Sequence, residues 1–156
     1  EELVNPIENN LIYDLYCGAG TISLFVSNKT KKIIGIEGSS EAIYYARSNA
    51  NRNGIVNADF IQGDILQTFT TSFVEKKGQP DTIILDPPRS GTLIEIKKTI
   101  LAAKPKKIIY ASCNPVSLAW DLKQLTEKYC ISTVDLYDQY PWSHHVETIV
   151  SLDLIR

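Results

Sequence analysis

The chain of 156 residues contains no methionine, only two histidines and three cysteines, and no long hydrophobic run. Three cysteines without a C-x-x-C pair argue against a disulfide framework or a zinc ribbon, and we expect a reducing, cytoplasmic setting. No apolar stretch approaches the roughly 20 residues that cross a bilayer, and no signal peptide opens the chain, so we expect no membrane partner. The missing initiator methionine predicts a piece of a longer protein.

The sequence also lacks an excess of charge of one sign, because 16 basic and 18 acidic residues give a net charge of -2. A domain that holds RNA by itself usually has a basic face, whereas the lysines here occur as scattered pairs typical of solvated helix ends. If RNA is the substrate, much of its binding must come from other parts of the protein. No obligate protein partner is evident. With 44% hydrophobic residues, the chain can form one domain with a full core.

Short apolar runs alternate with longer amphipathic ones along the chain. We expect strands at 11–15, 32–36, 57–62, 81–85, 107–112, 131–138 and 146–155, and helices at 19–28, 40–53, 66–76, 92–103 and 115–128. This order predicts an α/β, Rossmann-like fold with a seven-stranded, mostly parallel sheet and helices on both faces. Residues 139–145 are too few for a parallel crossover, so the last strand should run antiparallel. Its start then lies at the edge where the parallel strands end and ligands bind.

A glycine turn, Asp14-Leu-Tyr-Cys-Gly-Ala-Gly-Thr, follows the first strand and leads directly into a helix. Gly18 and Gly20 allow the backbone to bend tightly and to approach a ligand. Glu37 ends the second strand roughly 20 residues later, where a carboxylate can accept hydrogen bonds from ribose hydroxyls and has few structural duties. Asp64 ends the third strand, where it can accept from an adenine amino group or cap the next helix.

The residue at the third glycine position of such a turn distinguishes two kinds of nucleoside cofactor. A dinucleotide site requires a third glycine and a pyrophosphate at the helix N-terminus, but Ser23 occupies that position. S-adenosylmethionine has no phosphate and does not require that geometry. The turn therefore favours S-adenosylmethionine over a nicotinamide dinucleotide.

The fourth strand leads into Asp86-Pro-Pro-Arg-Ser-Gly. The two prolines hold this loop extended, so we expect Asp86 to project into the ligand crevice. Amino-group methyltransferases have an aromatic residue after the prolines, whereas this chain has Arg89. A guanidinium group suits a phosphate or a polarised pyrimidine carbonyl, although a plain surface arginine is an equally good interpretation.

One of the three cysteines has the surroundings of a nucleophile. Cys113 follows the fifth strand and precedes Asn114 and Pro115, a good N-cap and a good first residue of a helix. A helix N-terminus favours the thiolate form of a cysteine. Cys17 instead belongs to the glycine turn, and Cys130 is interpreted as a small apolar residue entering a strand.

A segment with two histidines and a glutamate precedes the last strand. Adjacent side chains on an extended segment point apart, and no third histidine exists to join His144 and His145, so we expect no metal site. Glu147 opens the antiparallel strand, which should bring it to the edge that carries Asp86 and Cys113. A nucleophile, a carboxylate base and a methyl donor would then surround one crevice.

Taken together and in this order, Asp86-Pro-Pro-Arg-Ser-Gly, Ser112-Cys-Asn-Pro and His145-Val-Glu-Thr resemble the motifs of the RNA uracil-5 methyltransferases. These class I, S-adenosylmethionine-dependent enzymes act on transfer RNA and 23S ribosomal RNA, and the resemblance runs from about Leu11 to the C-terminus. It implies a nucleophile at Cys113 and a proton acceptor at Glu147. The cofactor contacts that it implies are Tyr16, Thr21, Glu37, Asp64 and Asp86, in addition to the turn glycines.

Three features of that family are missing from residues 1–156: a glutamine upstream of the first strand, the N-terminal RNA-binding barrel, and the cysteine cluster that holds an iron–sulfur centre in some members. The resemblance thus implies a single S-adenosylmethionine-binding catalytic domain. Its expected activity is methylation of uridine carbon 5 in RNA, with 23S ribosomal RNA as the expected target, through a bond from Cys113 to uracil carbon 6. Arg89 and His145 are the expected substrate contacts. The alternatives are an amino-group or ribose methyltransferase and a non-catalytic nucleoside-binding module.

Overall fold

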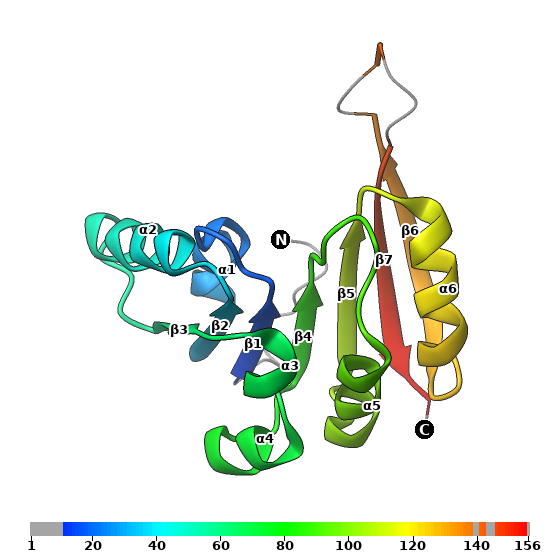
Figure 1. The fold of residues 1–156 in the computed structure, drawn as a ribbon, viewed down its shortest axis with the longest axis horizontal. Helices are drawn as coiled ribbons and strands as arrows, with labels where there is room; N and C mark the ends of the chain where they lie inside the picture. Colours follow the sequence, from blue (N-terminus) through cyan, green and yellow to red (C-terminus); the bar gives the residue numbers. More distant parts are fainter. Residues whose placement is uncertain (1–10, 139–140, 143–145, 156) are drawn as a thin grey trace.

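The computed structural model describes residues 11–138, 141–142 and 146–155. In this part of the chain, one seven-stranded sheet has the order β3-β2-β1-β4-β5-β7-β6 (Figure 1). The strands are β1 (Leu11–Leu15), β2 (Lys32–Glu37), β3 (Ala58–Gln62), β4 (Thr82–Leu85), β5 (Lys107–Ser112), β6 (Tyr129–Tyr137) and β7 (Glu147–Leu154). The first five are parallel, and β7 is antiparallel to both β5 and β6. The predicted α/β topology, including the antiparallel last strand, is confirmed.

Helices cover both faces of the sheet. They are α1 (Thr21–Phe25), the 3-10 helix η1 (Ser27–Lys29), α2 (Ser40–Arg52), α3 (Ile65–Thr68), α4 (Thr71–Lys77), α5 (Ile94–Ala103) and α6 (Pro115–Leu125). Alternate residues of a strand point to opposite faces, which divides the core in two. Tyr13 and Leu15 of β1 pack in the larger cluster with residues of α4, α5 and α6. Ile12 packs on the other face with Val26 next to α1, and α2 buries its apolar side beside them.

Two predicted helices are divided in the structure. Residues 66–76 form α3 and α4, because Phe69 leaves the helix to enter the core at 1% exposure and stacks edge-to-face on Tyr13. Thr70 then takes an extended conformation and caps α4 by accepting from the backbone N–H of Phe73. Likewise, residues 19–28 form only the short α1, followed by η1.

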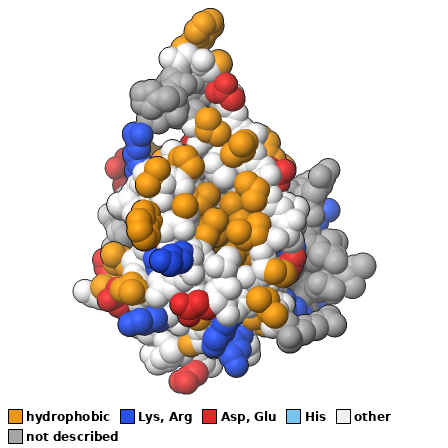
Figure 2. Space-filling view, turned by 90° about the vertical axis from the view of Figure 1, so that its right-hand side faces the viewer, with side chains coloured by type: hydrophobic (Ala, Val, Ile, Leu, Met, Phe, Trp, Pro, Cys, Tyr) orange, Lys and Arg blue, Asp and Glu red, His pale blue; other side chains and the backbone are white. Residues whose placement is uncertain are grey.

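Exposed apolar side chains gather on the side of the molecule formed by α6 and β6 (Figure 2). Val116 and Trp120 come from α6, and Ile131, Val134 and Leu136 come from β6. Since β6 is the last strand of the sheet, this face lies next to an open strand edge. Among the residues described, no helix has both the length and the apolar character needed to cross a membrane.

Candidate active site

The proposed nucleophile and base lie at the same edge of the sheet. Ser112, the last residue of β5, pairs with Thr148 of the antiparallel β7. Cys113 and Glu147 occupy the next positions after this pair, one on each strand. They are thus brought together at the carboxyl edge of the parallel strands, as the antiparallel last strand predicts. Figure 1 shows β7 beginning at the edge where β5 ends.

Asp86 lies at this edge beside Glu147. It directly follows β4, and its backbone N–H donates to the carbonyl of Leu15 at 3.4 Å, which extends the ladder from β1. Partial desolvation by the surrounding chain, and then the charge of Glu147, raise the pKa of Asp86, although the residue as a whole is exposed. The two carboxyl groups are therefore close enough to interact, and a proton is held more readily here than on an isolated aspartate.

Cys113 has the helix N-terminus that the sequence predicts. Asn114 is the N-cap of α6, its side chain accepts from the backbone N–H of Val116 at 3.1 Å, and Pro115 is the first helical residue. The Cys113 side chain is partly exposed and forms no disulfide. It is thus accessible to a substrate and lies beside the positive end of a helix dipole.

The other two cysteines differ from Cys113. Cys17 is buried below the glycine turn, where burial, and then the charges of Asp14 and Glu37, raise the pKa of its thiol. Cys130 is the second residue of β6, so its predicted place at the entry to a strand is confirmed, and its side chain is exposed.

The two glycines of the turn have different roles, although both have left-handed backbones with φ values of 52° at Gly18 and 80° at Gly20. A Cβ added to Gly18 would meet no atom within 4 Å, so this side of the turn is open to a ligand. A Cβ added to Gly20 would lie 2.8 Å from the ring of Phe60 and 3.1 Å from the methyl group of Ala46. Gly20 is therefore required for packing against β3 and α2.

Glu37 has more structural duties than the sequence predicts. Its Oε2 accepts from the backbone N–H of Gly18 at 3.2 Å, and its Oε1 accepts from the backbone N–H of Ser39 at 2.8 Å. The expectation that this carboxylate has few such duties is wrong, because it joins the turn after β1 to the start of α2. A carboxylate has about four acceptor positions, so acceptance from ribose hydroxyls stays compatible with these bonds.

Asp64, Thr21 and Tyr16 lie around the same turn. Asp64 is the N-cap of α3 and accepts from the backbone N–H of Gln67 at 3.1 Å, so the capping alternative is confirmed. Thr21 is the exposed first residue of α1. Tyr16 has a left-handed backbone with φ 65° and shares a hydrogen bond of 2.8 Å with the hydroxyl of Thr92. Cofactor contact by these three residues stays a prediction.

The residue in place of a third glycine has a defined partner. Ser23 is fully buried, and its hydroxyl donates to Oδ2 of the equally buried Asp14 at 2.6 Å. The other carboxyl oxygen of Asp14 has no hydrogen-bond partner. Burial raises the pKa of Asp14 to about 7, with the Ser23 bond lowering it and the charge of Asp86 raising it. Sequence reasoning missed Asp14; an acidic residue inside an otherwise apolar strand was the available signal.

The two expected substrate contacts have different outcomes. Arg89 is exposed, and its backbone carbonyl accepts from Asn114 and Ser117 at the start of α6, while a role for its guanidinium group stays a prediction. His145 lies outside the described residues, as does His144. Within the described part of the chain, no cluster of three or more His, Cys, Asp or Glu side chains could hold a metal ion.

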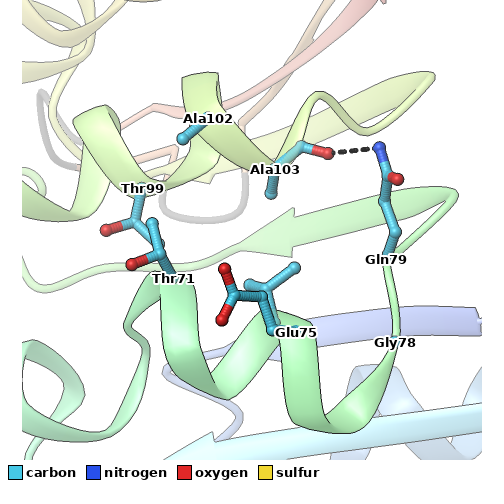
Figure 3. A pocket seen from close by; sticks show the side chains of 8 residues that line it. Thr71, Glu75, Gly78, Gln79, Thr99, Ala102 and Ala103 are labelled. Atoms are coloured by element: carbon cyan, nitrogen blue, oxygen red, sulfur yellow. Dashed lines mark hydrogen bonds between the residues drawn. The ribbon is translucent and has the colours of Figure 1, made fainter.

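A separate hollow of about 530 Å³ lies between α4 and α5 (Figure 3). Thr71 and Glu75 line it from α4 and Thr99 from α5, and the Gln79 amide donates to the carbonyl of Ala103 at 2.7 Å across one end. Glu75 is the titratable side chain among the lining residues. None of the predicted site residues lines this hollow. Those that the structure describes lie instead at or near the carboxyl edge of the sheet, which is therefore the candidate active site.

Comparisons with known proteins point to one enzyme family. Residues 2–155 match the family model described as tRNA (Uracil-5-)-methyltransferase. An uncharacterized RNA methyltransferase of Bacteroides thetaiotaomicron is 47% identical over 144 residues, covering 92% of this chain and 32% of that protein. The chain spans about a third of the length of the curated relatives that it matches.

One solved structure agrees with this family, and a more distant one shares the fold alone. The tRNA (uracil-54, C5)-methyltransferase of Pyrococcus abyssi, in complex with S-adenosyl-L-homocysteine, is 32% identical with a TM-score of 0.83, covering 97% of this chain and 35% of that chain. An rRNA methylase of Streptococcus thermophilus is 14% identical with a TM-score of 0.73, covering 99% of this chain and 91% of that chain, and shares the fold.

Proposed function

Because the chain belongs to the tRNA (uracil-5-)-methyltransferase family, we propose that it is the catalytic domain of an enzyme that methylates carbon 5 of uridine in RNA. The observation that carries this proposal is the meeting of Cys113 and Glu147 at one edge of the sheet, next to Asp86. An amino-group or ribose methyltransferase has no need of a cysteine and a carboxylate at these positions. A non-catalytic module has no need of either.

S-adenosylmethionine suits the surroundings of the glycine turn. The open side of Gly18 leaves room for a ligand beside Glu37. Asp64 and Asp86 add acidic groups along the same edge, which disfavours a phosphate and favours a cation. The Pyrococcus abyssi relative binds S-adenosyl-L-homocysteine, the product of methyl transfer. We propose that Tyr16, Thr21, Glu37, Asp64 and Asp86 hold the cofactor.

Cys113 acts in the first step of the proposed reaction, and Glu147 acts after methyl transfer. The Cys113 thiolate forms a bond to carbon 6 of the uracil, and the electron pair of the ring double bond moves toward carbon 5 and the carbonyl oxygen. When bound, S-adenosylmethionine supplies an electrophilic methyl group on a sulfonium, which suits the carbon 5 nucleophile so formed. Glu147 then removes the carbon 5 proton, the ring double bond returns, and Cys113 leaves as a thiolate. The uridine must be flipped from its stack to reach this edge.

The target is inferred from the resemblance and from the relatives. We propose 23S ribosomal RNA as the target, with transfer RNA as the second candidate because the Pyrococcus abyssi relative acts on tRNA uracil-54. A net charge of -2 gives this domain little attraction for RNA, so further parts of a longer protein should hold it. Catalysis requires Cys113 to be reduced, which fits a reducing compartment such as the cytoplasm.

The test is methyl transfer by the full-length protein to 23S ribosomal RNA and transfer RNA transcripts, with mass mapping of the methylated nucleosides. We expect 5-methyluridine from the wild type, at least 1,000-fold less from Cys113→Ala, and on the order of 100-fold less from Glu147→Gln. Cys130→Ser removes an exposed cysteine of β6 and serves as the matched control with unchanged activity. Formation of 5-methyluridine by Cys113→Ala would refute the mechanism. A methylated amino group or ribose would instead identify the alternative enzyme class, and cofactor binding without turnover would indicate the non-catalytic module.

A further inference from the structure

A buried ion pair lies beneath the loop that carries Asp86. Asp121 of α6 and Lys97 of α5 are only 4% and 8% exposed, and their side chains form a salt bridge. Both charges lose their hydration on burial, so such a pair contributes little net stability compared with apolar residues of the same size. The main effect of this ion pair is therefore on the groups that Asp121 holds in place, and its own contribution to stability is small.

Asp121 accepts hydrogen bonds from three separate parts of the chain. Its Oδ2 accepts from the backbone N–H of Thr92 at 2.8 Å and from the hydroxyl of Tyr110 in β5, and its Oδ1 accepts from Lys97. Burial, and then the bond to Asp121, raise the pKa of Tyr110, so its hydroxyl stays protonated and donates at neutral pH. Both carboxyl oxygens of Asp121 are thus occupied by fixed donors.

The loop from Asp86 to Thr92 rests directly on α6. The carbonyl of Arg89 accepts from the side chains of Asn114 at 3.0 Å and Ser117 at 3.1 Å. Gly91 has a left-handed backbone with φ 83°, and a Cβ there would lie 2.6 Å from Oδ2 of Asp121. The loop is thereby held against the first turns of the helix that begins right after the proposed nucleophile.

The same network reaches the cofactor turn. The hydroxyl of Tyr16 lies 2.8 Å from the hydroxyl of Thr92, whose backbone N–H donates to Asp121. A continuous path of hydrogen bonds therefore runs from Tyr16 through Thr92 and Asp121 to Tyr110 in β5. It joins the three segments that carry the proposed cofactor site, the Asp86 loop and the nucleophile.

We propose that Asp121 is a positioning residue, which holds the Asp86–Thr92 loop and the start of α6 in fixed register with the cofactor turn. The inference rests on the proposed function and deepens it, because it names what aligns Cys113 with the methyl donor. Asp121 contacts no reactant itself. A misplacement of about 1 Å in reacting groups can lower the rate about 100-fold, so a lost anchor should reduce turnover more than binding.

The test separates positioning from stability by replacing the ion pair with apolar residues. In the double variant Lys97→Met/Asp121→Leu, no buried charge is left unpaired, but two buried donors lose their acceptor at a cost of about 1–3 kcal/mol each, so we expect cooperative unfolding with a Tm lower by roughly 5–20 °C. These two donors belong to Thr92 and Tyr110. We expect kcat for methyl transfer to fall about 10- to 100-fold, while the Kd for S-adenosylhomocysteine changes less than about threefold. Amide hydrogen exchange at Thr92 should become faster.

Two further variants complete the test. Asp153→Asn removes a partner of Lys107 in a half-exposed ion pair at the opposite end of β5, and should leave kcat unchanged. If the double variant does not fold, Tyr110→Phe removes one donor to Asp121 and keeps the ion pair, and we expect a loss of kcat of about three- to tenfold.

The outcomes distinguish the two proposals. A wild type that forms no 5-methyluridine refutes the proposed function, and the role of Asp121 in it fails as well. If the wild type is active and the folded double variant, or Tyr110→Phe in its place, keeps kcat within about twofold, only the positioning role is refuted. A rise in the cofactor Kd as large as the loss of kcat would also overturn it, because Asp121 would then serve binding.

Discussion

At the scale of single residues, Asp14 combines full burial with an unpaired carboxyl oxygen. Ser23 satisfies Oδ2, whereas Oδ1 has no hydrogen-bond partner, and the charge of Asp86 at the end of β4 acts on the same carboxyl group. The buried thiol of Cys17 is the other titratable group beside it. An ionised Asp14 is thus unfavourable in the folded protein, and its pKa is raised to about 7.

Asp14→Asn should therefore change how stability depends on pH. Below the unfolded pKa, near 4, Asp14 is protonated in both states and contributes nothing. As the pH rises from about 4 to about 7, the unfolded state loses its proton first, so the Asp14 contribution to the free energy of unfolding falls by up to about 4 kcal/mol. Urea unfolding at pH 5 and pH 8 measures about 3 kcal/mol of this difference, and we expect the variant to lose most of that pH dependence.

Asp59→Asn is the control for that measurement, because it removes a carboxylate on the surface next to Lys32. It should keep the pH dependence of the wild type. An Asp14→Asn variant that also keeps it would show that Asp14 is ionised in the folded protein at neutral pH without cost.

Site residues can be predicted from the sequence when they lie at the end of a strand or the start of a helix, because local patterns mark those positions. Cys113 at the start of α6 and Glu147 at the start of β7 are both found where local patterns place them. Asp121 could not be found in this way, because its contact with Thr92 joins residues 29 positions apart and depends on how α5 and α6 pack. Glu37 shows the same limit, since its bonds to Gly18 and Ser39 require the turn and the helix to meet.

At the scale of elements, the turn between β1 and α1 combines a ligand-facing glycine with a packing glycine. Gly18→Ala and Gly20→Ala should each cost about 1 kcal/mol, because an alanine is strained in a left-handed backbone. Gly20→Ala should cost a further 1–3 kcal/mol or so, since its methyl group overlaps Phe60 and Ala46. Gly18→Ala should instead lower the affinity for S-adenosylhomocysteine about tenfold or more, because its methyl group enters the open side of the turn.

Urea unfolding and titration calorimetry measure these two effects side by side. The two glycines serve as controls for each other, since their backbones are similar and their surroundings differ. A larger loss of stability at Gly18 than at Gly20 would contradict the assignment.

Local periodicity predicts that a helix is present better than it predicts where that helix ends. Residues 66–76 have one amphipathic pattern, yet Phe69 turns into the core and Thr70 starts a new helix. Burial of the large Phe69 side chain against Tyr13 stabilises the fold more than a few additional helical hydrogen bonds would. Caps at Ser39 and Asn114, in contrast, depend on neighbouring residues and are predictable from the sequence.

At the scale of the whole molecule, the site results from topology. The parallel strands end at one edge, and the antiparallel β7 begins there (Figure 1). The glycine turn after β1, Cys113 after β5 and Glu147 at the start of β7 therefore lie at the same edge, although they are far apart in the chain. Loop length alone predicts this arrangement, since seven residues between the last two predicted strands leave no room for a crossover helix. The apolar face of α6 and β6, in contrast, could be found only once α6 and β6 were placed next to each other (Figure 2).

Covalent capture on RNA that contains 5-fluorouridine at the target position tests the proposed mechanism most directly. Fluorine at carbon 5 cannot be removed as a proton, so Glu147 cannot complete the reaction and Cys113 should stay bonded to carbon 6 of the methylated base. We predict a denaturation-stable adduct of the full-length protein in the presence of S-adenosylmethionine, mapped by peptide mass spectrometry to Cys113. No adduct while 5-methyluridine is still formed on normal RNA, or an adduct on Cys17 or Cys130, would contradict the mechanism.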